Sequence, residues 1–143
     1  MKILVLNGPN LARLDLRDSQ IYGSLNFSQL RDLIEKNAAD LGLSADVRQT
    51  DSEEEMIHWL HEAAESKVPV IINPAAFTHY SYAIRDAAEM LKAPLIEVHL
   101  SNPLKREEFR HTSVISGIAS GTIAGFGPDS YILALQAMRN LVK

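Results

Sequence analysis

The sequence contains no cysteine. This absence excludes a disulfide-stabilised scaffold, a thiolate metal site and a cysteine nucleophile, and it fits a reducing compartment. Long apolar runs are also missing, since no stretch approaches the roughly 20 residues needed to cross a membrane. Met1 and Lys2 lead directly into a strand pattern and not into a signal peptide. We therefore expect a cytoplasmic protein without a membrane partner.

Positive charge is not in excess. The chain has 14 Lys and Arg against 18 Asp and Glu, a net charge of -4, which argues against nucleic acid as a partner. Six of the acids fall within residues 51–66, which hold no Lys or Arg. The rest of the chain is therefore slightly basic, and the acidic stretch is most simply a solvated helix face.

The size and composition indicate one domain. Of the 143 residues, 46% are hydrophobic, as in ordinary globular domains. A chain of this length buries on the order of two thirds of its unfolded surface, so it needs neither a disulfide nor a metal to fold. We expect a single domain over residues 1–143.

Four apolar runs rich in Ile, Val and Leu are typical of strands buried in a parallel sheet, and they cover residues 3–6, 68–72, 95–98 and 122–124. A weaker, alternating run at 45–49 suits an edge strand. Helical patterns lie between the runs, over residues 27–41, after Ser52, and over 81–91 and 128–142. This alternation predicts an α/β fold, a flavodoxin-like doubly wound sheet of five parallel strands in the order 2-1-3-4-5.

Polar residues follow three of the predicted strands. The first strand is followed by Asn7-Gly8-Pro9-Asn10, the third by Asn73-Pro74 and the fourth by His99-Leu100-Ser101-Asn102. In a sheet of this order, ligands bind beyond the carboxyl ends of the strands, where the strand order reverses. The sequence therefore predicts one crevice lined by amides, a hydroxyl and an imidazole.

The connection over about residues 11–24 is longer than the roughly 2 to 6 residues usual between a strand and a helix. We expect it to act as a lid, and it carries Arg17 and Tyr22. Arg106 and Arg110 follow the fourth strand. Guanidinium groups suit carboxylates and phosphates, so an anionic small molecule is the expected ligand.

Other uses of this fold fit the residues poorly. The Asn-Gly-Pro-Asn turn offers few free N–H groups for a flavin or nucleotide phosphate. Asn7 and Asn73 stand where a phosphoacceptor switch needs acids that bind magnesium. His58 and His61 lie three residues apart but have no third ligand nearby in sequence. We therefore expect no metal site.

A set of ordered motifs extends from residue 3 to about 134. They are Asn7-Gly-Pro-Asn10-Leu11, Arg17 with Ile21-Tyr22-Gly23, Gln49 with Asp51-Ser52, Asn73-Pro74, Thr78-His79-Tyr80-Ser81 with Arg85-Asp86-Ala87, Glu97-Val98-His99-Leu100-Ser101-Asn102, and Arg106-Glu107-Glu108-Phe109-Arg110. With these motifs the chain resembles the type II 3-dehydroquinate dehydratases. These hydro-lyases of the shikimate pathway convert 3-dehydroquinate to 3-dehydroshikimate.

The resemblance implies a mechanism. An ionised Tyr22 would take a proton from the carbon beside the ketone. A free phenol ionises near pH 10, so a cation such as Arg17 must stabilise the phenolate near neutral pH. Asn10, with help from Asn73, would hold a water that stabilises the enolate. His99 would protonate the departing hydroxyl, and Glu97 would orient that imidazole.

The same resemblance implies how the substrate binds and how the chain assembles. The substrate carboxylate would meet the backbone of Leu100 and Ser101 and the amide of Asn73. The residues that would address its hydroxyls are His79, Arg110 and Arg106. Asp86 would reach a neighbouring subunit's site within trimers that form a dodecamer. No metal or organic cofactor is implied.

The lid departs from the family pattern at Asp15, Asp18 and Ser19, and Ala75 stands where glycine is common. Asp15 would place a negative charge near Arg17 and remove a residue free to adopt positive φ. Two alternatives therefore remain: a weakened family member that binds a cyclic polyhydroxy acid, and a flavodoxin-like nucleotide binder. The pathway would be chorismate and aromatic amino acid biosynthesis or, alternatively, quinate breakdown.

Overall fold

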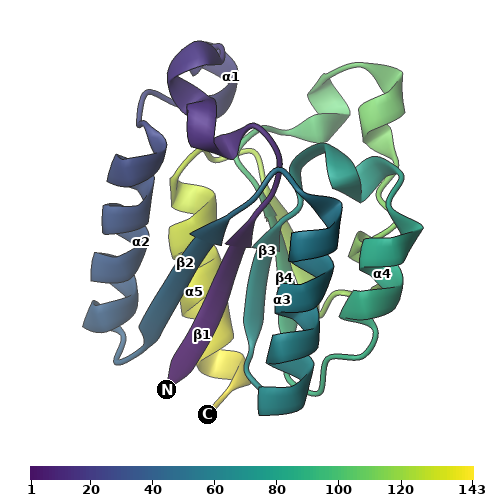
Figure 1. The fold of residues 1–143 in the computed structure, drawn as a ribbon. Helices are drawn as coiled ribbons and strands as arrows, with labels where there is room; N and C mark the ends of the chain where they lie inside the picture. The colour runs from purple at the N-terminus through teal and green to yellow at the C-terminus, as the bar shows by residue number, and fades with distance from the viewer.

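The computed structural model describes residues 1–143 and contains one five-stranded sheet (Figure 1). The strands are β1 (Lys2–Asn7), β2 (Ser44–Gln49), β3 (Val70–Asn73), β4 (Leu95–His99) and β5 (Gly121–Ala124), and the helices are α1 (Ser19–Tyr22), α2 (Phe27–Asp40), α3 (Glu53–Ser66), α4 (Tyr82–Ala88) and α5 (Asp129–Leu141). All neighbouring strands pair in parallel, in the order β2-β1-β3-β4-β5. The predicted α/β fold and strand order are confirmed.

The helices cover both faces of the sheet. Helices α2 and α5 pack on one face, and α3 and α4 pack on the other (Figure 1). The strands therefore bury residues on both sides: Val5 and Ile71 join the α2 and α5 side, whereas Leu4 and Ile72 join the other. This two-sided burial explains why β1, β3 and β4 read as continuous apolar runs. The edge strand β2 alternates because it is only partly covered.

The helices begin at the predicted capping residues, and one helix, α4, ends earlier than expected. Asn26 and Gln29 form the predicted capping box at α2, and the Ser52 side chain accepts from the backbone of Glu55 at α3. Helix α4 ends at Ala88, earlier than the expected 91. Its end tightens because the N–H groups of the next residues, Met90 and Leu91, bond three residues back before Pro94 stops the pattern.

The third strand begins two residues later than the apolar run suggests. The N–H of Val68 bonds to Ala63 at the end of α3, and Pro69 has no N–H to offer to a strand. Pairing with β1 therefore starts at Val70.

Two irregular segments rise above the carboxyl edge of the sheet. The first follows β1 and contains a 3₁₀ turn at Leu11–Leu16 and the single turn α1, which the sequence pattern did not predict. The second follows β4 and contains short 3₁₀ turns at Pro103–Lys105, Glu108–His111 and Ser116–Ile118. Figure 1 shows them on either side of the strand ends. The predicted crevice must lie between them.

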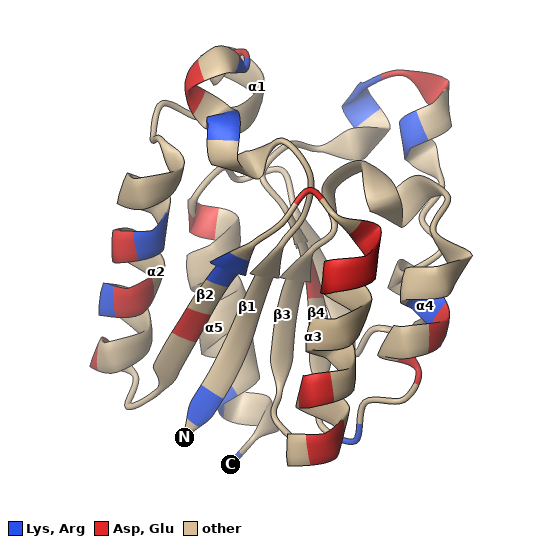
Figure 2. Ribbon diagram, in the orientation of Figure 1, with Lys and Arg blue, Asp and Glu red and all other residues tan.

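The acidic residues within 51–66 lie mostly along α3, as Figure 2 shows. Glu53, Glu54 and Glu55 occupy its first turn, where they complement the positive end of the helix dipole. No helix in the structure combines the length and the apolar character required to cross a membrane.

Candidate active site

Tyr22 and Arg17 are in direct contact within the connection between β1 and α2. The Asp18 side chain caps α1 by accepting from the N–H of Gln20 at 2.9 Å. This turn brings Tyr22 back over Arg17, whose Nη2 donates to the phenolic oxygen. The guanidinium carbon also lies 3.7 Å from the centre of the phenol ring. The guanidinium therefore contacts both the hydroxyl and the face of the Tyr22 ring.

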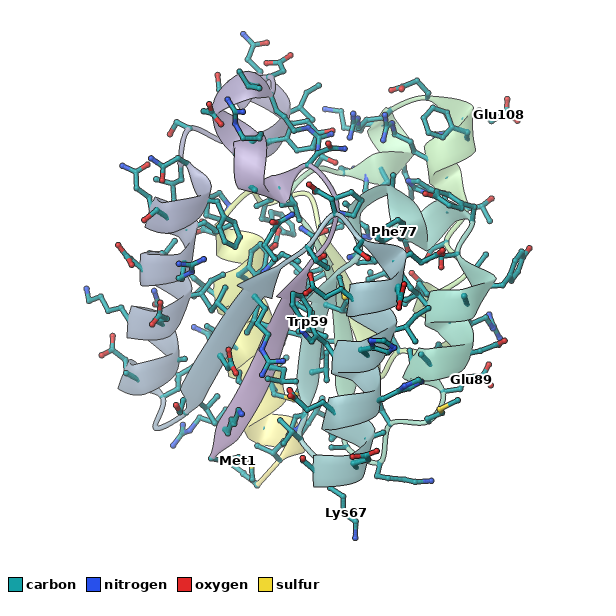
Figure 3. The ribbon with its side chains drawn as sticks, in the orientation of Figure 1. Met1, Trp59, Lys67, Phe77, Glu89 and Glu108 are labelled. Atoms are coloured by element: carbon teal, nitrogen blue, oxygen red, sulfur yellow. The ribbon has the colours of Figure 1, made fainter.

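A second guanidinium lies against the same ring. The Cζ of Arg106 is 5.0 Å from the centre of the Tyr22 ring, and its Nη1 donates to the Ser101 hydroxyl at 3.3 Å. Burial, together with the charges of Arg106 and Arg110, lowers the pKa of Arg17 although Tyr22 opposes the shift. Figure 3 shows nitrogen-bearing side chains between α1 and the segment that carries Glu108. Several cations thus surround one phenol.

Asn10 is held in a left-handed conformation with φ 72°. Its N–H donates to Asp51 at 2.9 Å, and Gln49 donates both to Asp51 and to the Gly8 carbonyl at 3.1 Å. These bonds from the end of β2 fix the turn and leave the Asn10 amide side chain without a protein partner. Gly8 is needed there because a Cβ would lie 2.6 Å from the Pro74 carbonyl oxygen.

Asn73 belongs to a buried chain of hydrogen bonds at the ends of β1 and β3. Its Nδ2 donates to the Tyr131 hydroxyl at 2.8 Å, and this hydroxyl donates to Asn7 at 2.5 Å. Tyr131 is wholly buried in the first turns of α5. Sequence reasoning missed Tyr131, because one aromatic residue on a helix pattern is usually a packing residue.

His99 contacts a wholly buried carboxylate. Its Nε2 lies 2.6 Å from Oε2 of Glu97. The hydroxyls that donate to this carboxylate belong to Thr78 and Ser116, each at 2.5 Å, and to Ser113 at 3.4 Å. Burial alone would raise the pKa of Glu97, but the His99 contact and the hydroxyls together hold it below its usual value. Glu97 therefore stays ionised.

The structure distributes the predicted residues over two adjacent hollows. The first has a volume of about 50 Å³, and its lining includes Asn10, Arg17, Tyr22, Asn73, Leu100, Ser101 and Arg106. The second has a volume of about 290 Å³, and its lining includes Glu97, His99 and Arg110. Consecutive residues of one strand end, His99 and Leu100, line different hollows. The first is smaller than the roughly 300 Å³ at the lower end for ligand pockets, but it adjoins another hollow of about 440 Å³ that shares Leu100, Ser101 and Arg106 with it.

Two predicted residues line neither hollow. His79 Nδ1 donates to the Thr112 carbonyl, 2.8 Å away, and its ring meets Phe109 edge to face. Asp86 is exposed on α4. Arg110, in the second hollow, also pairs with Glu107 at 3.1 Å. The single chain thus leaves His79 and Asp86 outside the two hollows.

The lid substitutions have effects different from those expected. Asp15 pairs with Arg13 at 3.0 Å and leaves Arg17 to Tyr22. It has no positive φ, so the expected loss of glycine freedom there is wrong. The strained position is Ala75, with φ 51°, where the sequence reasoning did note the missing glycine.

Metal ligands do not gather in the structure, which has no group of three or more His, Asp or Glu residues placed to hold an ion. The rings of His58 and His61 on α3 lie with their centres 6.1 Å apart and their planes tilted by 42°. The acidic helix therefore carries an aromatic pair on its surface.

The comparisons with known proteins agree with this geometry. The family model described as dehydroquinase class II matches residues 1–139. A 3-dehydroquinate dehydratase of Salinispora tropica is 53% identical over 135 residues, 94% of each chain, and one of Mycobacteroides abscessus is 54% identical over 136 residues, 95% of this chain and 94% of that protein.

Solved structures show the same relationship. The type II dehydroquinase of Propionibacterium acnes superposes with a TM-score of 0.95 at 53% identity, covering 97% of this chain and 96% of that one. A 3-dehydroquinate dehydratase-like protein of Bifidobacterium longum gives 0.77 at 49% identity, covering 100% and 98%. The resemblance noted in the sequence is confirmed, and the chain belongs to the class II dehydroquinase family.

Proposed function

We propose that this chain dehydrates 3-dehydroquinate to 3-dehydroshikimate by anti elimination of water through an enolate, with Tyr22 as base and His99 as acid. Membership of the family carries the overall reaction, a hydro-lyase step of the shikimate pathway. The contact of Arg17 and Arg106 with one phenol supports the assignment of the base. No other tyrosine of the chain is bonded to a cation.

In the first step, the Tyr22 phenolate takes a proton from the carbon beside the ketone. The C–H electron pair forms a carbon–carbon double bond to the carbonyl carbon, and the carbonyl oxygen becomes an enolate oxygen. A water held by the unpaired amide of Asn10 would donate to this oxygen, where negative charge develops. The rigid turn fixed by Asp51 supports this role, because a preorganised donor needs no reorganisation during the reaction.

In the second step, the enolate returns its electrons, the carbon–oxygen bond to the hydroxyl breaks, and His99 gives that oxygen a proton. Water leaves and a conjugated enone remains. Glu97 acts as a positioning residue, since its carboxylate holds one ring nitrogen of His99 at 2.6 Å and so fixes the orientation of the imidazole. Both protons are accounted for without a cofactor.

The substrate carboxylate would lie in the first hollow, against Leu100, Ser101 and Asn73. The buried Nε of Arg106 makes no hydrogen bond within the protein, although Glu107 Oε1 lies 3.9 Å away, and a buried donor without a hydrogen bond is costly unless a ligand satisfies it. Arg106, Arg110 and His79 would therefore address the oxygens of the substrate.

Asp86 would act across a subunit boundary, in trimers assembled into a dodecamer. Its exposure on α4, outside both hollows, is what an intersubunit role requires. Large apolar side chains of the same region, Tyr80, Tyr82 and Met90, are also exposed and suit contact with another copy. A cytoplasmic location stays a prediction.

The alternative of a weakened family member has less support, because Asp15 is paired with Arg13 and does not oppose Arg17. Purified protein mixed with 3-dehydroquinate should develop the absorbance of the conjugated enone. Tyr22→Phe should abolish turnover and retain ligand binding, whereas Ser28→Ala, which removes an exposed hydroxyl on α2, should leave the rate unchanged. Tight binding with no product from the unaltered protein would favour the alternative, and full activity of Tyr22→Phe would remove it as the base.

A further inference from the structure

Tyr131 connects the last helix to the ends of two central strands. Its ring is wholly buried, and its hydroxyl lies between Asn7 and Asn73, which are register partners in β1 and β3. A tyrosine that only packed would not need two amide partners. The hydroxyl therefore has a role at the strand ends beyond filling the core.

The direction of each hydrogen bond in this chain follows from backbone groups. The amide nitrogen of Asn7 faces the carbonyl oxygen of Arg48 at 3.0 Å, and a carbonyl can only accept. The amide oxygen of Asn7 must then face Tyr131. The phenol gives its single hydrogen to this oxygen at 2.5 Å, so its own oxygen is left as an acceptor.

The other end of the chain is fixed in the same way. The amide oxygen of Asn73 accepts from the N–H of Ala75 at 3.1 Å, and its nitrogen donates to the Tyr131 oxygen at 2.8 Å. The amide nitrogen carries a second hydrogen, for which the protein provides no acceptor. Asn73 lines the same hollow as Leu100 and Ser101. This hydrogen is available to a ligand.

Burial keeps the phenol of this chain of hydrogen bonds in one protonation state. It raises the pKa of Tyr131 far above its usual value, so the phenol keeps its hydrogen across the working pH range. With the phenol protonated and Asn7 held by the backbone, the Asn73 amide has one favourable orientation. In the reverse orientation, the amide NH₂ group of Asn73 would face the N–H of Ala75, which is also a donor. The amide oxygen would then face the hollow.

We infer that Tyr131 is a positioning residue that, together with the N–H of Ala75, makes Asn73 present an N–H, and not its oxygen, to the carboxylate of the substrate. The inference rests on the proposed function and deepens it. The reversed amide would place its oxygen against a carboxylate, where two acceptors repel. Tyr131 thereby makes the site prefer a ligand with a carboxylate over the same ligand with a neutral carboxamide. It does so through a hydroxyl that touches no substrate atom.

The variant Tyr131→Phe removes only this hydroxyl. Its KM for 3-dehydroquinate should rise roughly tenfold, the size expected when one hydrogen bond to a charged group is lost, while kcat should fall less. Inhibition by quinate and by its carboxamide should be compared in both proteins. The unaltered protein should prefer the acid, and the variant should lose most of this preference.

A control separates positioning from stability. Ser28→Ala removes a hydroxyl from an exposed residue of α2 and should change neither KM nor the preference. Thermal melting should establish that Tyr131→Phe is folded at the assay temperature. If the folded variant keeps both the KM and the acid preference of the unaltered protein, the inference is wrong and Tyr131 is structural.

A measurement on the unaltered protein does not depend on the variant. In protein with ¹⁵N-labelled asparagine, one of the two side-chain amide protons of Asn73 should shift downfield when quinate is added. The carboxamide should give a smaller shift. No response of this pair to bound quinate would overturn the inference. Absence of turnover in the unaltered protein would instead count against the proposed function.

Discussion

The imidazole of His99 lies 2.6 Å from the carboxylate of Glu97, through its Nε2 atom. With Nε2 engaged, Nδ1 is the nitrogen left to face a leaving hydroxyl. The carboxylate is itself held by hydroxyls from three other residues, two of them at 2.5 Å. The orientation of the proposed acid is thus set by a carboxylate that is itself held in place, as in other carboxylate–imidazole pairs.

Replacing Glu97 by Gln should lower kcat by on the order of 10²-fold, because the amide no longer stabilises the imidazolium. The KM should change much less, since Glu97 does not contact the substrate. Steady-state kinetics on the folded variant test this. A variant with the kcat of the unaltered protein would mean that Glu97 is only a buried structural group.

The ionisation of Glu97 should also make the free energy of unfolding depend on pH. Its pKa in the folded protein lies below the ordinary value of 4.5, so its contribution is complete above pH 4.5 and is lost as the pH falls through the lowered value. Urea unfolding should therefore show that the difference in stability between the unaltered protein and Glu97→Gln shrinks between neutral pH and pH 3. A constant difference would contradict the shift.

Removing the guanidinium of Arg17 should lower kcat. In Arg17→Gln the Tyr22 hydroxyl loses the cation that donates to it, so kcat should fall by on the order of 10²-fold, the scale of losing one positioned charged donor. The control is Arg13→Gln, because Arg13 is exposed and its side chain bonds only to Asp15. Steady-state kinetics measure this, and if both variants kept the kcat of the unaltered protein, Arg17 would not act on Tyr22.

Replacing Ala75 by Gly should stabilise the protein. Ala75 has φ 51°, where a side chain costs roughly 1 to 2 kcal/mol, and the greater freedom of glycine in the unfolded chain offsets part of this gain. A net increase of about 0.5 kcal/mol in the free energy of unfolding is expected. Chemical denaturation measures it, and a decrease would show that the methyl group packs favourably.

Much of the fold could be predicted because its signals are local. Continuous apolar runs identified β1, β3 and β4, and Asn26 with Gln29 marked the start of α2. Pro69 displaced the start of β3 through its missing N–H, an effect that an apolar run does not contain. Helix α1 was missed because four residues are too few for a helical period to show.

Only those parts of the site that lie directly at the strand ends could be predicted from the sequence. Strand order brought Asn10, Asn73 and Leu100 to one hollow. Strand alternation turned the side chain of His99 toward another hollow, which a list of strand ends does not reveal. Tyr131 lies 58 residues from Asn73 along the chain, and no local pattern connects a helix residue to an amide so distant.

The contact between Arg17 and Tyr22 has a consequence for the timing of catalysis. Both residues belong to the connection between β1 and α2, whereas Glu97 and His99 belong to a central strand. A swing of that connection that admits substrate would carry away the base and its activating cation together. The open enzyme would keep its acid ready and have no base at all, so proton removal could begin only after the connection had returned over a bound substrate.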